Sequence, residues 1–349
     1  MGSVMSLSNT SQLLLRNVDL LDCTQALLIN TPADNFVEQF IQHNNNTTID
    51  CFNVNYAEHL ALKKFQYQQL NTHFSAYYHN DKKHDLAIIS FPKSKAEFTY
   101  ILAMIAPHLA DKAKLLFVGE NKSGVKSVAK LSNDYLCYCE KIDSARHCSL
   151  FLGEFNGKST VFNLNNWYKE YPLNIDGINL TIAALPGVFS QNELDIGTQL
   201  LLDNLPKKMS GKVLDFGCGA GVISAFIGKK FNTTTLELLD VNALALTSAK
   251  KTLAINGLNG HVFASDSLSQ VKNSFQHVVA NPPFHQGLKT HYASTESFLS
   301  GIKKHLNNNG DITIVANNFL RYQPIMAEHI GKTVKLVNKK GFCVYKSYR

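Results

Sequence analysis

Short apolar runs and segments of helical spacing alternate through the second half of the chain. Apolar runs typical of buried strands cover 213–216, 234–240, 261–265, 275–280 and 311–317. Apolar residues at helical spacing predict helices over 222–230, 243–255 and about 294–306. This alternation is typical of βαβ units around a parallel sheet. Two further strands, 333–338 and 342–348, are predicted to form a hairpin around 339–341, which gives a mostly parallel sheet of seven strands.

The first half of the chain repeats this order without turns that could hold a ligand. Predicted strands at 26–30 and 85–90 run into Thr31-Pro32 and Phe91-Pro92 rather than into glycines. A predicted helix and a further strand follow over 95–109 and 114–121. We interpret this order as an old duplication whose first copy lost its ligand site, although any two α/β domains share such an order.

The predicted fold class is therefore α/β, with two doubly wound Rossmann-like domains of which the first is degenerate. We expect the first domain over residues 1–165 and the ligand-binding domain over residues 185–349. Residues 166–184 are predicted to be a linker, because the chain is polar and rich in turn residues from Asn163 to Asn179. The degenerate domain could still bind a polyanion or the substrate through its lysines.

The length and composition limit the class of protein. With 349 residues, the chain can form two domains with buried cores. No apolar run reaches the roughly 18 residues of a membrane helix, and the first residues lack the pattern of a secretory signal. The seven cysteines are scattered, and the spacing of Cys137 and Cys139 does not suit zinc. We therefore expect a cytoplasmic protein with reduced thiols, no membrane segment and no metal ion.

The formal net charge of +7 is concentrated near the C-terminus. From residue 302 to residue 349, nine basic residues are opposed only by Asp311 and Glu328, and nine minus two equals the whole excess. A basic surface is the electrostatic footprint of a nucleic-acid partner, although it can also be an ordinary solvated face. Lys339 and Lys340 lie in the predicted hairpin turn, where we expect them to contact RNA.

Three alternating glycines follow the predicted strand at 213–216. Gly217, Gly219 and Gly221 permit a tight turn and let a ligand approach the backbone at the N-terminus of the next helix. A dinucleotide fingerprint would place its third glycine where Val222 stands, which disfavours an oxidoreductase. Asp215, just before the turn, would repel a pyrophosphate but suits a ligand with a cationic amino group. The turn thus favours a nucleotide-type site of another kind.

Acids follow the next two predicted strands. Asp240 stands 23 residues after Gly217, where the acid that ends the second strand of a βαβ unit binds ribose hydroxyls. Asp266 follows the third strand, where an acid can meet the exocyclic amine of an adenine. Either acid alone is commonly a helix cap. Chance is nevertheless a poor explanation for a glycine turn, two acids and Asn281 in this order.

The motif Asn281-Pro282-Pro283-Phe284 directly follows the apolar run at 275–280. Proline has no backbone N–H, so the strand must end there, at the sheet edge where open α/β folds bind ligands. The Asn281 oxygen and the Pro282 carbonyl can each accept one N–H of an exocyclic amine. Phe284 can stack on the ring that carries this amine, which contributes about 1–3 kcal/mol. The alternative is a strand-ending turn that happens to contain Asn and Pro.

These motifs carry a resemblance to a known family. Residues 186–349 resemble the class I S-adenosylmethionine-dependent methyltransferases, and the Asn-Pro-Pro-Phe motif resembles that of the amino-group methyltransferases. Four segments resemble the small-subunit ribosomal RNA guanine-N(2) methyltransferases of the RsmC type, namely 185–190, 194–198, 281–285 and 314–317. The resemblance covers nearly the whole chain, more loosely in its first half, and it implies S-adenosylmethionine as the cofactor.

The resemblance and the motifs together define three sets of predicted residues. The cofactor-binding set is Thr198, Asp215, Gly217, Gly219, Gly221, Asp240, Val241, Asp266 and Asn281. The catalytic set is Asn281, Pro282 and Phe284. The substrate-binding set is Phe189, Phe284, His285, Lys339 and Lys340, in which we expect His285 to contact the substrate rather than to accept its proton.

The resemblance also implies a reaction, namely methyl transfer to the exocyclic N(2) amine of a guanine in 16S ribosomal RNA, guanine 1207 in that family's naming. It implies assembled small ribosomal subunits as the substrate, and we expect a monomer. Adenine-N(6) and glutamine-N(5) methyltransferases share the Asn-Pro-Pro motif and remain as alternatives. A catalytically inactive RNA-binding assembly factor is a third alternative, which the retention of Asp215, Asp240 and Asn281 disfavours.

Overall fold

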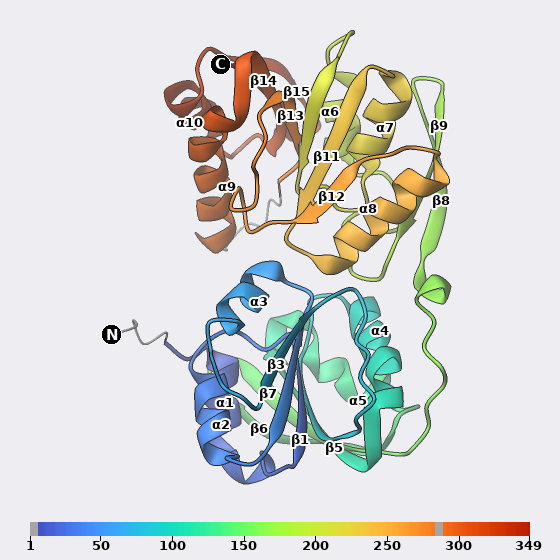
Figure 1. The fold of residues 1–349 in the computed structure, drawn as a ribbon, viewed down its shortest axis with the longest axis vertical. Helices are drawn as coiled ribbons and strands as arrows, with labels where there is room; N and C mark the ends of the chain where they lie inside the picture. Colours follow the sequence, from blue (N-terminus) through green and yellow to red (C-terminus); the bar gives the residue numbers. More distant parts are fainter. Residues whose placement is uncertain (1–5, 283–288) are drawn as a thin grey trace. The chain divides into compact units, whose positions relative to one another are not determined.

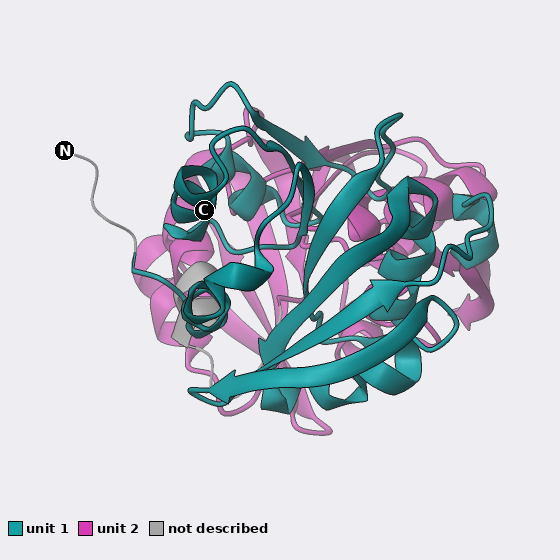
Figure 2. Cartoon of the chain, turned by 90° about the horizontal axis from the view of Figure 1, so that it is seen from below, with its two compact units in different colours: residues 1–167 teal, residues 168–349 magenta. Residues whose placement is uncertain are grey.

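The chain forms two compact units, Met1–Trp167 and Tyr168–Arg349 (Figure 2). The computed structural model describes residues 6–282 and 289–349, with only the backbone over 289–294. Each unit has one seven-stranded sheet, ordered β3-β2-β1-β4-β5-β7-β6 in the first unit and β12-β11-β10-β13-β14-β16-β15 in the second (Figure 1). If the strands of each sheet are numbered from 1 to 7 along the chain, both sheets have the order 3-2-1-4-5-7-6, as a duplication predicts. The prediction of two Rossmann-like domains is confirmed.

The first unit contains the strands β1 (Gln25–Ile29), β2 (Thr48–Asn53), β3 (Leu70–Phe74), β4 (His84–Ser90), β5 (Leu109–Glu120), β6 (Leu136–Ala145) and β7 (Cys148–Phe155). Its α-helices are α1 (Asn9–Arg16), α2 (Phe36–His43), α3 (Tyr56–Leu62), α4 (Lys95–Ile105) and α5 (Val128–Leu131). The helix predicted over 95–109 ends earlier and continues as a short 3-10 helix, Ala106–His108, because Pro107 lacks the N–H that an α-helix needs.

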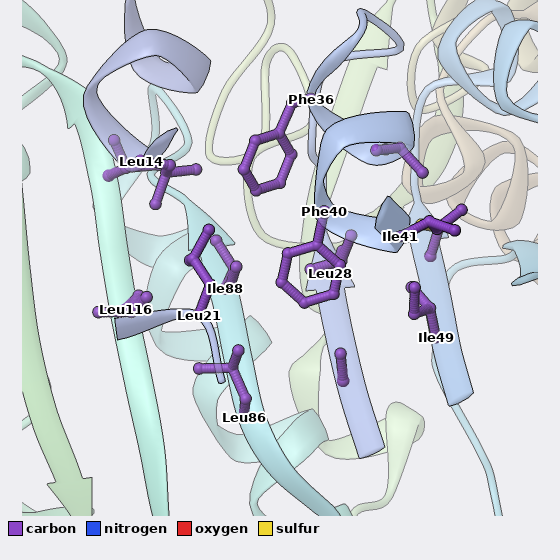
Figure 3. Close-up of a cluster of buried hydrophobic side chains, with 14 of the residues drawn as sticks. Leu14, Leu21, Leu28, Phe36, Phe40, Ile41, Ile49, Leu86, Ile88 and Leu116 are labelled. Atoms are coloured by element: carbon purple, nitrogen blue, oxygen red, sulfur yellow. The ribbon is translucent and has the colours of Figure 1, made fainter. Parts of the chain in front are cut away.

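Alternation along the strands builds the core of the first unit. Leu28 of β1 and Ile88 of β4 point to the same face of the sheet, where α1 and α2 cover them (Figure 3). In α2, Phe36 and Phe40 lie one turn apart and are fully buried against that face. Burying an aromatic side chain of this size removes about 150–250 Å² of surface from water, so these two rings anchor the helix to the sheet.

The second unit contains β8 (Lys169–Ile175), β9 (Ile178–Ala184), α6 (Ile196–Asp203), β10 (Gly211–Phe216), α7 (Val222–Lys230), β11 (Thr234–Asp240), α8 (Ala243–Ile255), β12 (His261–Ala264), β13 (Phe275–Ala280), α9 (Lys289–Gly301), β14 (Leu306–Asn317), α10 (Tyr322–His329), β15 (Thr333–Lys339) and β16 (Phe342–Tyr348). Helices α9 and α10 cover one face of its sheet, and α6, α7 and α8 cover the other (Figure 1). On the first face, Phe298 of α9 stacks on Phe216 of β10, with ring centroids 3.7 Å apart.

The linker predicted over 166–184 is wrong for most of that range. Residues 169–184 instead form a β-hairpin, β8–β9, which belongs to the second unit. Asp176 and Gly177 make its turn with positive φ angles of 51° and 76°. Asp-Gly between alternating apolar residues is a strong hairpin signal, so this polar stretch carries the turn chemistry of a hairpin rather than that of a linker.

Side chains of α8 hold this hairpin in place. Ser248, Thr252 and Asn256 follow one another at intervals of four residues and are buried. These side chains accept hydrogen bonds from alternate backbone N–H groups of β9 and of the residue after it. Asn256 Oδ1 accepts from Thr181 N at 3.0 Å, and Thr252 Oγ1 accepts from Ala183 N at 3.1 Å. Ser248 Oγ accepts from Leu185 N at 3.0 Å. Four helical residues rise about 6 Å and two strand residues about 6.6 Å, so the two spacings match.

The C-terminal hairpin is confirmed. Strands β15 and β16 pair antiparallel and are closed by the pair Lys339 and Phe342. Lys340 and Gly341 form the turn with φ angles of 52° and 82°, both left-handed, as a two-residue type I′ turn requires. The helix predicted over about 294–306 is shifted, since α9 begins at Lys289 and a 3-10 turn over Ile302–His305 leads into β14.

Candidate active site at the carboxyl edge of the second sheet

The glycine turn joins β10 to α7. Gly217, Gly219 and Gly221 have φ angles of 71°, 52° and 80°, which residues with a Cβ rarely adopt. At Gly221 an added Cβ would lie 3.1 Å from Ala249 of α8. At Gly217 and Gly219 an added Cβ would meet no atom within 4 Å, so the space above these two residues is open. The turn therefore exposes backbone that a ligand can approach closely.

Asp240, the last residue of β11, ties the glycine turn to the neighbouring strand. Its Oδ2 accepts a hydrogen bond from Gly219 N at 3.0 Å, and its Oδ1 accepts one from Asn242 N at 2.9 Å. A carboxylate offers about four acceptor positions, and the backbone N–H of Val241 also interacts with this one, so some acceptor capacity is left for a ligand. Burial raises the pKa of Asp240 above its usual value, whereas the backbone hydrogen bonds oppose that rise.

Asp215 lies fully buried at the end of β10, beneath the glycine turn. Its Oδ2 accepts hydrogen bonds from Ser224 N at 3.1 Å and Ser224 Oγ at 2.7 Å, whereas no described residue donates to its Oδ1. Burial and, to a lesser extent, the nearby Asp240 raise the pKa of Asp215 to about 7. This buried acceptor would be stabilised by a positive charge. Ser224 supports Asp215 from α7, and nothing in the sequence singled it out.

Asn281 follows β13 and bonds across to α6. Its Nδ2 donates to Thr198 Oγ1 at 2.8 Å and to Asp195 Oδ2 at 3.1 Å. Asp195 is the N-cap of α6, and the same Oδ2 accepts from Thr198 N at 2.8 Å. An ionised carboxylate only accepts hydrogen bonds, so the nitrogen of Asn281 must face it. The Asn281 oxygen therefore faces away from Asp195, and no described residue donates to it.

The strand order brings these residues to one edge. Strands β12, β11, β10 and β13 are parallel neighbours, so their carboxyl ends align. Asp266, Asp240, the glycine turn and Asn281 follow these ends in that order. The chain moves outward from β10 to β12 and then returns to β13, which makes the gap between β10 and β13 the switch point where such sheets bind ligands.

The basic hairpin turn reaches the same edge. Strand β16 runs antiparallel to β14, and its first residue, Phe342, pairs with Asn317 at the carboxyl end of β14. The turn at Lys340 and Gly341 therefore lies on the side of the sheet where Asn281 lies. Lys339 and Lys340 are exposed there, and the Phe342 ring lies next to Gly197 of α6.

The remaining predicted residues differ in how far they are exposed. Val241 follows Asp240 and is half-buried, Pro282 is buried, and Phe189 is 60% exposed in the loop before α6. Asp266 is exposed in the turn after β12 and bonds nothing among the described residues by its side chain. Phe284 and His285 lie outside the described residues.

Comparison with known protein families agrees with this architecture. Residues 179–346 match the methyltransferase small domain, and residues 11–171 match the methyltransferase small domain N-terminal family. These two matches define a methyltransferase built from a small domain and its N-terminal partner. Among the relatives is the ribosomal RNA small subunit methyltransferase C of Colwellia psychrerythraea, 55% identical over 99% of both chains. The chain belongs to the ribosomal RNA small subunit methyltransferase C family.

One further relative supports the family, and one solved structure shares the fold. The protein of the same name from Vibrio vulnificus is 39% identical over 96% of this chain and 97% of its own. A solved structure of the T. thermophilus 16S rRNA N2 G1207 methyltransferase, in complex with AdoMet and guanosine, matches 100% of this chain and 94% of its own. The TM-score is 0.84 at 21% identity, which shows that the two proteins share the fold of both units.

The described residues include neither a membrane-spanning helix nor a cluster of metal ligands. None of their helices has both the length and the apolar character to cross a membrane. Their His, Cys, Asp and Glu side chains form no group of three or more that could hold a metal ion.

Proposed function

We propose that this protein transfers a methyl group from S-adenosylmethionine to the N(2) amine of a guanine in the 16S ribosomal RNA of the small subunit. The observation that carries the proposal is the Asn281 amide at the switch point, whose nitrogen is engaged and whose oxygen is left to accept. The relatives' name specifies ribosomal RNA, and the T. thermophilus protein of the same fold is named for guanine 1207. We propose that nucleotide as the target, and a monomer acting on assembled subunits in the cytoplasm.

The residues at this edge fit the cofactor. The remaining acceptor capacity of Asp240 suits the ribose hydroxyls, and the open space above Gly217 and Gly219 lets a ligand approach the backbone. The Asp215 carboxylate provides negative charge for the cationic amino group, and Asp266 lies two strands away for the adenine amine. When bound, S-adenosylmethionine supplies an electrophilic methyl group on a sulfonium centre.

Asn281 and Pro282 would orient the amine that receives the methyl group. An aromatic amine is a poor nucleophile because its lone pair is delocalised into the ring. If the Asn281 oxygen and the Pro282 carbonyl each accept one N–H, the nitrogen moves toward sp3 geometry and its lone pair points at the methyl group. Most of the acceleration then comes from positioning and charge placement. No strong base is needed beforehand, because the proton becomes acidic once the nitrogen is alkylated.

The test of the proposal is methyl transfer to defined substrates. The purified protein is incubated with labelled S-adenosylmethionine and one of three substrates in parallel reactions. The substrates are small subunits, naked 16S RNA and total protein, each prepared from cells that lack this methyltransferase activity. We expect the label in RNA, recovered after digestion as N(2)-methylguanosine. Label recovered as N(6)-methyladenosine or as methylated glutamine would replace the proposal by one of its alternatives. Cofactor binding without transfer to any substrate would indicate an inactive assembly factor.

The raised pKa of Asp215 predicts a pH-dependent affinity for the cofactor. A cationic amino group favours the ionised carboxylate, so binding should release the proton that Asp215 holds below its pKa of about 7. Affinity should therefore rise by up to about tenfold per pH unit from about pH 5.5 to 7 and level off above it. Calorimetry in buffers of different ionisation heat measures both affinity and proton release. In Asp215→Asn the rise should flatten, and an unchanged slope would show that Asp215 does not sense the cofactor.

The hairpin lysines predict the salt dependence of RNA binding. Replacing Lys339 and Lys340 with Gln should flatten the slope of log K against log salt by up to about 1.4, twice the 0.7 expected for each phosphate contact to single-stranded RNA. The matched control replaces Lys207 and Lys208, an exposed pair that precedes β10 at the opposite edge of the same sheet. Filter binding at several salt concentrations measures the slopes. Equal slopes for the hairpin variant and the wild type would mean that RNA contacts another face.

A further inference from the structure

We infer that Asp195 is a positioning residue, which holds the Asn281 amide in the one orientation that presents its oxygen to the substrate amine. This inference rests on the proposed function, and it concerns a residue that binds neither substrate nor cofactor in that proposal. The two residues lie 86 positions apart in the chain and meet because α6 packs against β14 and β16, next to the residue that follows β13.

The Asp195 carboxylate discriminates between the two orientations of the amide. In the observed orientation the Asn281 Nδ2 lies 3.1 Å from Asp195 Oδ2 and 2.8 Å from Thr198 Oγ1. A half-turn of the amide would place its oxygen against the carboxylate, so two acceptors would face each other and a hydrogen bond to a charged group would be lost. The rotated amide would also present N–H groups to the substrate amine, which itself donates.

Thr198 cannot make this choice by itself. A hydroxyl both donates and accepts, so it could bond either the nitrogen or the oxygen of Asn281. Asp195 Oδ2 also accepts a hydrogen bond from the Thr198 hydroxyl, whose Oγ1 lies 3.4 Å away. This bond leaves a lone pair of Thr198 Oγ1 to accept from the Asn281 nitrogen. The acceptor-only carboxylate thus sets the direction of every hydrogen bond in this group of three side chains.

Asp195 has a second, purely structural role that an experiment must separate from the first. As the N-cap of α6, its Oδ2 accepts from Thr198 N at 2.8 Å. Serine is also a good N-cap, but its single oxygen sits one bond closer to the backbone and is taken up by the cap. Asparagine is a good N-cap as well. Because Thr198 N donates, the side-chain oxygen of an asparagine at position 195 would take the place of Asp195 Oδ2. Asp195→Ser therefore keeps the cap and loses the contact with Asn281, whereas Asp195→Asn keeps both.

The test measures single-turnover methyl transfer to small subunits by the full chain, together with S-adenosylmethionine affinity and thermal melting. For Asp195→Ser we expect a rate constant lower by about 10- to 100-fold, the loss typical of a misplaced reacting group, with cofactor affinity within about twofold of the wild type. Asp195→Asn should stay within about threefold in rate. Asn55→Ala, which removes the N-cap of α3 in the first unit, controls for the loss of a helix cap.

A double-mutant cycle decides whether Asp195 acts through Asn281. In an Asn281→Ala background, Asp195→Ser should lower the residual rate constant no further. A wild-type rate in Asp195→Ser, or a full additional loss in the Asn281→Ala background, would overturn the inference. If the wild type itself methylates no RNA, the proposed function fails instead. The orientation can then be followed by NMR of the Asn281 side-chain amide, whose hydrogen exchange should accelerate in Asp195→Ser and stay slow in Asp195→Asn. Equal exchange in the two variants would overturn the inference.

Discussion

Replacing Asn281 with alanine is expected to lower the rate constant of methyl transfer by about 10²–10³-fold, the loss typical when one preorganised hydrogen-bonding group is removed from a reacting centre. The Asn281 oxygen is assigned to an amine whose geometry changes as it is alkylated, so its contribution should be largest in the transition state. The affinity for S-adenosylmethionine should change little, because the proposed function assigns Asn281 to the acceptor nitrogen; a large loss of affinity would instead favour its predicted place in the cofactor-binding set. Single-turnover kinetics with small subunits and calorimetry with the cofactor measure the two quantities.

Asn204→Ala is the matched control for this change. Asn204 lies at the other end of α6, where its Nδ2 donates to Leu200 O at 2.8 Å. Its loss should cost a comparable hydrogen bond while leaving methyl transfer intact. A rate constant near the wild-type value in Asn281→Ala would refute the assigned role of the amide. A large loss in both variants would indicate a general loss of structure around α6.

Replacing Asp240 with alanine should weaken cofactor binding more than any other single change at this edge. Hydrogen bonds to a charged group contribute about 1.5–3 kcal/mol each, so losing two ribose contacts should cost about 3–6 kcal/mol, roughly a 10²- to 10⁴-fold loss of affinity. The same carboxylate holds Gly219 N and Asn242 N, so the glycine turn also loses one of its hydrogen bonds to β11, whereas those from Gly217 N and Cys218 N to Leu239 O remain. Calorimetry measures the affinity, and thermal melting reports whether the fold persists.

Two variants bracket this prediction. Asp240→Asn keeps one acceptor oxygen and should show an intermediate affinity. Glu237→Gln changes another acid of β11, which lies away from the glycine turn. The Oε1 atom of Glu237 accepts a hydrogen bond from Asn273 Nδ2 at 2.7 Å. The Glu237→Gln variant should bind the cofactor like the wild type. Unchanged affinity in Asp240→Ala would mean that this acid only caps the turn before α8.

Much of the second unit was predictable from local patterns. The helices at 222–230 and 243–255 and the strands at 234–240 and 275–280 have the bounds that the apolar spacing predicts. These elements are each buried against a sheet or a layer of helices, so the period of their apolar residues is unambiguous. The hairpin at β8–β9 has a local signal in Asp176-Gly177, but its packing against α8 depends on side chains far along the chain, which local patterns do not show.

The amino-acid sequence by itself determined the elements, the glycine turn and the acids that follow the strands, because these depend on short-range spacing and backbone conformation. Only the tertiary structure decided which side chains meet. Asp195 reaches Asn281, and Ser224 reaches Asp215, because strand order and helix packing join segments that are distant in sequence. The tertiary structure also decided the protonation of Asp215 and the orientation of Asn281. Burial at the end of β10 raises the pKa of Asp215, and the Asp195 carboxylate, which only accepts hydrogen bonds, orients the Asn281 amide.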